Sequence, residues 1–173
     1  MLKKIILSSV LFSLPLCALA DIGVDGARHL LLRTGFGANP AQIAAYAPLS
    51  REAAVDKILA GVRTQPATPP PGWANDPFER PGQPGLTEEQ KKALQQERNQ
   101  HAVELRSWWL AEMLATPSPL TEKMTLFWHN HFVSALDKVR SPQMLYQQNL
   151  LLRHYALGDF GQLLHAVARD PAM

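Results

Sequence analysis

The chain has 173 residues and a formal net charge of +2, and 46% of its residues are hydrophobic. This length allows one domain with its own apolar core. The small net charge excludes the clustered basic face of a nucleic-acid-binding protein, and the single cysteine, Cys17, excludes an internal disulfide.

Residues 1–20 have the pattern of a secretory signal peptide. Two lysines come first, an apolar run follows from Ile5, and the segment ends in Ala18-Leu19-Ala20, a small-x-small cleavage site. The apolar run is too short for a comfortable membrane span. We therefore expect cleavage before Asp21, a periplasmic or secreted mature domain over residues 21–173, and no membrane attachment. Cleavage removes two of the 17 basic residues and leaves 15, which balance the 15 acidic residues.

Three short helices are predicted first in the mature chain. Each combines apolar spacing with a capping residue, and they cover residues 25–33, 40–46 and 51–60. Gly35 and Gly37 follow the first helix and are interpreted as a helix stop or a tight turn. The alternative, a phosphate-binding loop, would need a preceding strand and a Lys-Ser/Thr pair, which this segment lacks.

Residues 64–86 form a proline-rich insert. Its seven prolines rule out a helix and predict an extended, partly disordered segment. Trp73 and Phe78 are expected to pin it to the surface of the domain. A peptide ligand for another protein, or a lid over a site, is the functional alternative.

A long helix is predicted from Thr87, which forms a capping box with Gln90, to about residue 115. Its first half, KKALQQERNQ, is polar nearly all round and is expected to be solvated. Its second half carries large apolar side chains that are expected to pack in the core, namely Leu105, Trp108, Trp109 and Leu114.

The segment over residues 118–136 is the most aromatic part of the chain and is predicted to be a helix packed on two sides. Ser118-Pro119 supplies its start. Trp128 and His131 fall on one broad apolar face at about 100° per residue, so both are expected inside the protein. His129 lies about 200° away from His131 around the helix, so the two imidazoles cannot share one metal ion, and no metal site is predicted.

A buried His131 needs a hydrogen-bond partner or a ligand, because an unmet polar group inside a protein costs roughly 1–3 kcal/mol. A satisfied core histidine and a catalytic or ligand-binding histidine are both consistent with the sequence. The candidates for a catalytic role are His129, His131 and Asn130. The sequence identifies neither a reaction nor a cofactor.

After a polar turn at residues 137–140, two further helices are predicted, over residues 141–156 and from Asp159 onward. The mature chain contains no convincing strand. The predicted fold is therefore all-α, an irregular orthogonal array of helices with a long proline-rich loop.

A polar stripe runs along the helix over residues 141–156. Tyr146, Asn149 and Arg153 lie at i, i+3 and i+7, beside the apolar face. Such a stripe can bind a carboxylate or a phosphate, because the arginine fork suits both. Solvated surface and a row of structural ion pairs are the alternatives.

Three segments of the sequence together carry a family resemblance. They are LLRTGFGANPAQI, TEKMTLFWHNHFVSAL and QNLLLRHYALGDFGQLLHAVARDPAM. In wording and order they resemble the bacterial domain-of-unknown-function family 1800 (DUF1800). The resemblance covers residues 27–58 and 121–173, and the proline-rich insert lies outside it.

The resemblance implies an exported, mainly helical bacterial protein. The family has no established reaction, so no catalytic residue is carried over. Its members are longer than this chain, which implies a domain truncated at its C-terminus, whose remaining part completes any site. They often occur beside another exported family, which implies a partner protein.

Two functions remain open. The first is a scaffold or assembly module that acts with a partner protein, which the wide apolar faces and the half-polar long helix favour. The second is an exported enzyme, or a metal- or cofactor-binding domain, with a His/Asn/Arg site around residues 118–136. No HExxH motif, GxSxG motif or carboxylate pair indicates a specific reaction.

Overall fold

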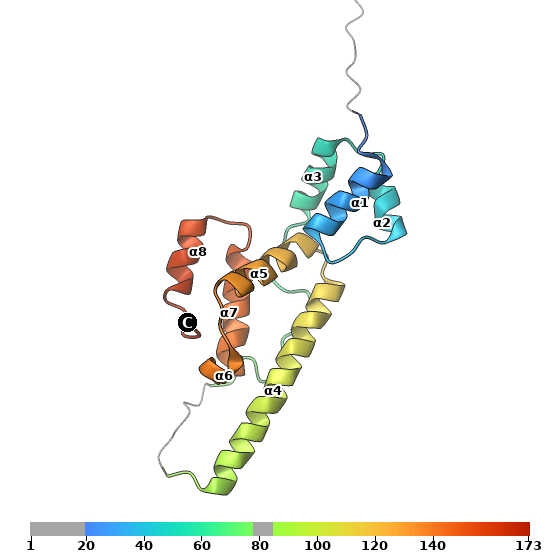
Figure 1. Ribbon diagram of the computed structural model, residues 1–173. Coiled ribbons are helices and arrows are strands. Elements are labelled where there is room, and N and C mark those ends of the chain that lie inside the picture. Colours follow the sequence, from blue (N-terminus) through green and yellow to red (C-terminus); the bar gives the residue numbers. More distant parts are fainter. Residues whose placement is uncertain (1–19, 78–84) are drawn as a thin grey trace, which may run out of the picture.

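The computed structural model describes residues 20–77 and 85–173, which form eight helices and no strand (Figure 1). Of the residues that the structure describes, 65% are helical, so the predicted all-α class is confirmed. The predicted signal peptide lies outside the described residues, except for Ala20. None of the eight helices combines the length and the apolar content needed to cross a bilayer. The helices are α1 (Gly23–Thr34), α2 (Pro40–Tyr46), α3 (Arg51–Ala60), α4 (Glu88–Ala115), α5 (Pro119–His131), α6 (Leu136–Val139), α7 (Pro142–Tyr155) and α8 (Phe160–Val167).

Helix α7 is the centre of the larger part of the molecule. It packs against α4, α5, α6 and α8, while α1, α2 and α3 gather near the C-terminal end of α4 (Figure 1). Helix α5 joins the two parts, because it contacts α1 as well as α4 and α7.

Most of the predicted capping residues start their helices as expected, but Ser118 makes no side-chain capping bond at α5, and α1 begins at Gly23, before the predicted cap Asp25. Thr87 and Gln90 form a reciprocal capping box at α4. The side chains of Ser50 and Asp159 accept the backbone N–H groups of Ala53 and Gln162 at 3.2 and 2.9 Å. Each of these bonds satisfies a donor that the first helical turn leaves unpaired.

The segment over residues 118–136 was predicted to be a single helix, and this prediction is wrong. Helix α5 ends at His131, because Phe132 leaves the helical region at φ −97° and ψ 72°. The chain then starts a second short helix, α6, over part of the segment predicted as a polar turn. Helical periodicity assigns residues to faces only within one continuous helix, so the faces predicted for residues after His131 are wrong.

Two side chains predicted to be inside lie outside. Leu114 is 80% exposed, because it falls on the side of α4 that faces away from α7. His131 is exposed at the end of α5, where its ring stacks on Phe127 at 6.2 Å. Trp128 is half-buried, and its indole N–H donates to the Ala156 carbonyl at 2.9 Å.

A fully buried ion pair joins α5 to α7. Arg153 donates from Nε and Nη2 to the two carboxylate oxygens of Glu122 at 2.6 and 2.9 Å, and both side chains are about 1% exposed or less. Trp109 of α4 donates its indole N–H to the same carboxylate at 3.2 Å. Arg153, which the sequence analysis considers as an anion-binding group, thus binds the Glu122 carboxylate of its own chain.

A second buried carboxylate, Glu112 on α4, holds the described part of the proline-rich insert. It accepts the backbone N–H groups of Ala67 and Thr68 at 3.0 and 2.6 Å. Burial raises the pKa of Glu112, but these hydrogen bonds and the charge of Arg153 outweigh that effect and hold the pKa below its usual value.

Trp73 fixes the insert a second time, as predicted. It is 6% exposed, stacks on His101 at 4.7 Å and donates to Glu104 at 2.7 Å. Phe78, the other predicted anchor, lies outside the described residues.

Removing one partner of the buried pair should destabilise the protein strongly. The substitution Arg153→Met leaves the Glu122 carboxylate buried without its cation, so we expect the free energy of unfolding to fall by about 3–5 kcal/mol. Urea denaturation followed by circular dichroism measures this change.

The exposed pair Lys91–Glu88, with a 2.7 Å contact, supplies the matched control. Lys91→Met should shift the denaturation midpoint far less than Arg153→Met. The double variant Glu122→Leu/Arg153→Met should recover part of the loss, because it buries no unpaired charge. Equal effects of Lys91→Met and Arg153→Met would contradict this account.

Candidate functional site

A cavity of about 190 Å³ lies among α4, α5, α6 and α7. Its wall is mostly apolar, with four polar side chains that come from three of these helices and from the loop after α5. This combination of an apolar lining with a few convergent polar groups is typical of small-molecule sites. The lining residues are Ala102, Leu105, Arg106, Trp109, His129, Ser134, Leu136, Leu145 and Asn149.

His129 enters the cavity from the last turn of α5. Its ring stands edge-on to the indole of Trp109 at 5.0 Å, and neither ring nitrogen is hydrogen-bonded to a residue that the structure describes. Burial lowers the pKa of His129 below its ordinary value of 6.5. The imidazole is therefore neutral at pH 7 and offers one donor and one acceptor.

Asn149 of α7 lies on the opposite wall. The side chain is 5% exposed, and its Oδ1 atom has no hydrogen-bond partner among the described residues. An unmet buried amide oxygen costs roughly 1–3 kcal/mol.

Arg106 forms the polar edge of the cavity. It is exposed and forms no ion pair within the described part of the chain. It also lines a neighbouring hollow of about 620 Å³, together with Arg98 and Arg140. The acid in that hollow, Asp137, is paired with Lys138 at 3.3 Å, so the entrance beside Arg106 is positively charged.

The structure brings together only part of the site predicted from the sequence. His129 and Asn149 share the cavity, whereas Asn130 and His131 are exposed outside it. Arg153 is held by Glu122 behind Trp109, although its Nη1 atom has no partner.

The remaining predicted residue, Tyr146, is 4% exposed and packs edge-on against Trp108 at 4.9 Å. It therefore belongs to an apolar cluster beside the insert and not to the cavity wall.

Sequence reasoning missed Arg106 and favoured a core anchor over a ligand platform for Trp109. Arg106 lies three residues before Trp109, and this i, i+3 spacing places the two on adjacent parts of one helix surface. That signal was present in the sequence, but only the cavity shows that the surface faces His129 and Asn149.

The polar groups of the cavity wall are an imidazole, an amide, a hydroxyl group and a guanidinium group. The wall holds no carboxylate and no cysteine, and Ser134 donates to the Met173 sulfur at 3.5 Å and not to His129. Within residues 20–77 and 85–173, no group of three His, Cys, Asp or Glu side chains gathers in a way that could hold a metal ion.

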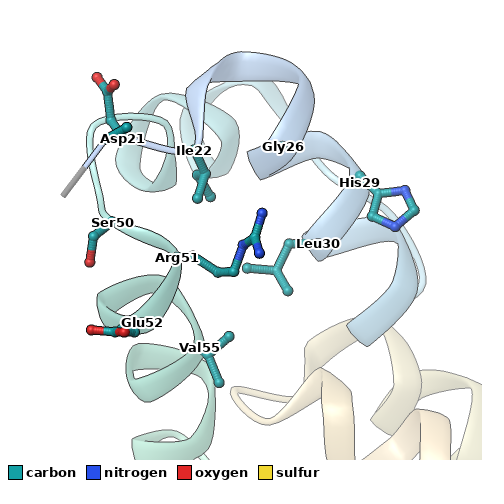
Figure 2. Close-up of a pocket in the computed structure, with 10 residues that line it drawn as sticks. Asp21, Ile22, Gly26, His29, Leu30, Ser50, Arg51, Glu52 and Val55 are labelled. Carbon is teal, nitrogen blue, oxygen red and sulfur yellow. The ribbon is translucent and has the colours of Figure 1, made fainter.

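A larger open hollow lies between α1 and the start of α3 (Figure 2). Arg51 extends across it between Ile22 and Leu30, while Asp21 and Glu52 point away from its centre (Figure 2). Its lining draws no residue from α4, α5 or α7. This hollow is therefore separate from the candidate site.

The part of the chain that the structure describes is thus an all-α domain with a partly open cavity among α4, α5, α6 and α7. The family model described as "Protein of unknown function (DUF1800)" matches residues 29–173, so the chain belongs to this family. The resemblance seen in the sequence is thereby confirmed. No curated protein and no solved structure was found to match the chain.

Because the pKa of His129 is lowered in the folded protein, the unfolded chain takes up this proton more readily than the folded chain does. Acidification from about pH 7.5 to about pH 5.5 should therefore remove stability at this residue, and raising the pH should restore it. We expect the loss on acidification to be smaller in His129→Asn than in the wild type. Urea denaturation of both proteins at the two pH values measures this difference, and equal losses would contradict it.

Proposed function

We propose that this protein is an exported helical assembly module that binds a partner protein through the outer face of α4. The signal-peptide pattern of residues 1–20 supports export. One structural observation supports docking. Three large aliphatic side chains lie on α4 in the open: Val103, Leu110 and Leu114 are 58%, 58% and 80% exposed.

These three side chains, which we name the α4 stripe, share one side of the helix. Positions i, i+7 and i+11 fall within about 40° of one another around a helix of 3.6 residues per turn. Glu112, on the opposite side, is 1% exposed and faces the interior. The second half of α4 therefore presents aliphatic side chains to solvent, while Glu112 and Trp108 face the interior.

Apolar surface that is exposed along a helix is stabilised by burial against another apolar surface, at roughly 25 cal/mol per Å². A partner helix with its own aliphatic stripe suits this shape, because paired stripes along two helices interlock side by side. The partner's chemistry is thus an amphipathic helix, and the α4 stripe is its docking surface.

Photo-crosslinking in cells tests this proposal. A photoreactive residue in place of Leu114 should capture one defined partner in the periplasm, and Val103→Glu/Leu110→Glu should abolish the capture, because two buried charges oppose docking. Gln96→Glu adds a charge on the same helix at an exposed polar position and should leave capture intact.

Capture that survives Val103→Glu/Leu110→Glu would overturn the proposal. So would a crosslink only to another copy or another part of the same chain. Circular dichroism of the double variant confirms that the loss does not come from unfolding.

A second candidate function is a binding domain for a small molecule, and the cavity between His129 and Asn149 favours it. The neutral His129 ring and the Asn149 side chain lie on a wall that is mostly apolar. Such a site suits a small ring compound with one polar group.

Phenol is a minimal probe of this second function. It should bind the wild type and raise the melting temperature, since binding to the folded state stabilises it. Ala102→Leu, which fills part of the cavity, should remove that rise, and Ala111→Leu on the exposed side of α4 should not. No effect of phenol on the wild type would contradict the binding-domain proposal.

A further inference from the structure

We infer that residues 64–77, the described part of the proline-rich insert, are a strap that occupies a peptide-binding surface of their own chain. When the strap opens, this surface takes an extended, proline-rich peptide of a partner protein in its place. The surface, which we name the strap face, is made of His101, Glu104, Trp108 and Glu112 of α4 and Tyr146 of α7. It lies on the side of α4 opposite the α4 stripe, so the inference does not depend on docking at that stripe.

Three hydrogen bonds from α4 hold the strap by its backbone. The N–H groups of Ala67 and Thr68 donate to the two carboxylate oxygens of Glu112 at 3.0 and 2.6 Å. The indole N–H of Trp108 donates to the Thr68 carbonyl at 3.3 Å. Every residue except proline carries both backbone groups, so these bonds fit any extended peptide with two consecutive N–H donors.

One large side chain of the strap adds selectivity. Trp73 is 6% exposed, stacks on His101 at 4.7 Å and donates its indole N–H to Glu104 at 2.7 Å. The prolines at 69–71 separate it from the two N–H donors. Proline has a fixed φ, so such a spacer loses little conformational freedom when it binds. The ligand class is therefore a peptide with two consecutive N–H donors, a proline spacer and an aromatic residue.

The strap is held more loosely than the helices beneath it. Among residues 64–77 only Trp73 and Ala74 are buried, and the others are half-buried or exposed. A segment with so few buried contacts opens locally at a lower free energy than the whole domain.

The strap face itself does not depend on the strap for its arrangement. Helices α4 and α7 pack against each other, and the Glu122–Arg153 pair with Trp109 ties both to α5. Opening of the strap removes both backbone donors from the Glu112 carboxylate, which is 1% exposed in the closed form. A carboxylate without donors in a largely apolar surface is unfavourable, so the open face favours a peptide that restores them.

A fluorescein-labelled synthetic peptide with the sequence of residues 64–77 is the probe, and fluorescence anisotropy with the full chain measures its binding. The strap competes with the probe, because the apparent affinity falls with the fraction of molecules whose binding surface is open. The double variant Ala67→Pro/Thr68→Pro removes both N–H donors of the strap. We expect it to bind the probe about tenfold or more tighter than the wild type does.

Three controls match this variant. Gln65→Pro adds a proline at an exposed strap position whose N–H makes no hydrogen bond to a described residue, and it should bind the probe no tighter than the wild type. A probe that carries proline at positions 67 and 68 should not bind the double variant. Glu112→Gln, added to the double variant, should weaken binding, because an amide offers one acceptor oxygen where the carboxylate offers two.

Circular dichroism checks that the double variant keeps its helices. Chymotrypsin tests opening in the wild type independently of any variant. It should cut after Trp73 before it cuts after Trp108, because the strap opens locally whereas cleavage in α4 requires that the helix unfolds. Cleavage after Trp73 that is no faster than cleavage after Trp108 would overturn the inference.

The other outcomes are equally decisive. A folded double variant that does not bind the probe overturns the inference. Equal binding of the proline-substituted probe would mean non-specific adsorption and would overturn it too. A dimer of the wild type in sedimentation, dissociated by excess probe, would make a second copy of this chain the ligand and would overturn the assignment to a partner.

Discussion

The buried pair between Glu122 and Arg153 is the interaction on which the rest of the structure depends. It joins α5 to α7, and Trp109 adds α4 to the same carboxylate. Two charges taken out of water are costly unless their geometry is good and their remaining donors and acceptors are met. Here the carboxylate receives three N–H donors, and the guanidinium lies over the Trp108 ring at 5.5 Å. Because the pair tolerates little displacement, it fixes how three helices sit relative to one another.

The cavity is a consequence of that arrangement. Trp109 donates to Glu122 with its indole nitrogen and presents an edge contact to His129 with its ring, so one side chain belongs to both the pair and the cavity wall. Asn149 and Arg153 are one helical turn apart on α7, and both are buried. The side chains that hold the helices together therefore also position the cavity, which makes a rigid site from a chain without disulfides or a large apolar core.

The apolar side chains of this protein are divided between small buried clusters and its surface. Among the described residues, the large buried apolar side chains form two small clusters, around Trp108 and around Leu163, and the largest fully buried side chain is that of Arg153. Large aliphatic and aromatic residues such as Leu114 and Phe127 remain outside. Exposed apolar side chains that gather on one face are typical of interaction surfaces, and the α4 stripe is proposed as a docking surface for this reason.

Local signals in the sequence predicted most of the helices but little of the site. Capping residues such as Thr87, Ser50 and Asp159 act within one turn, so they locate helix starts without any knowledge of tertiary structure. The pairing of Glu122 with Arg153 spans 31 positions, and helical periodicity does not encode which distant partner a buried charge finds. For the same reason the sequence identifies His129 as a candidate but not Arg106. The prediction that His131 is buried fails because α5 ends at this residue, where its side chain is exposed.

The two halves of α4 differ in local stability, because the first half is solvated and the second half packs against other helices. The start of α4 projects beyond the other helices (Figure 1) and is stabilised mainly by the capping box and by close-range pairs such as Gln95–Asn99 at 3.0 Å. Local opening there breaks few tertiary contacts, whereas opening beyond Ala102 must also break those to α5 and α7. Protection of the backbone amides from hydrogen exchange should therefore rise along α4 from its start to its end. The start of the helix opens more readily than the part that packs against α5 and α7.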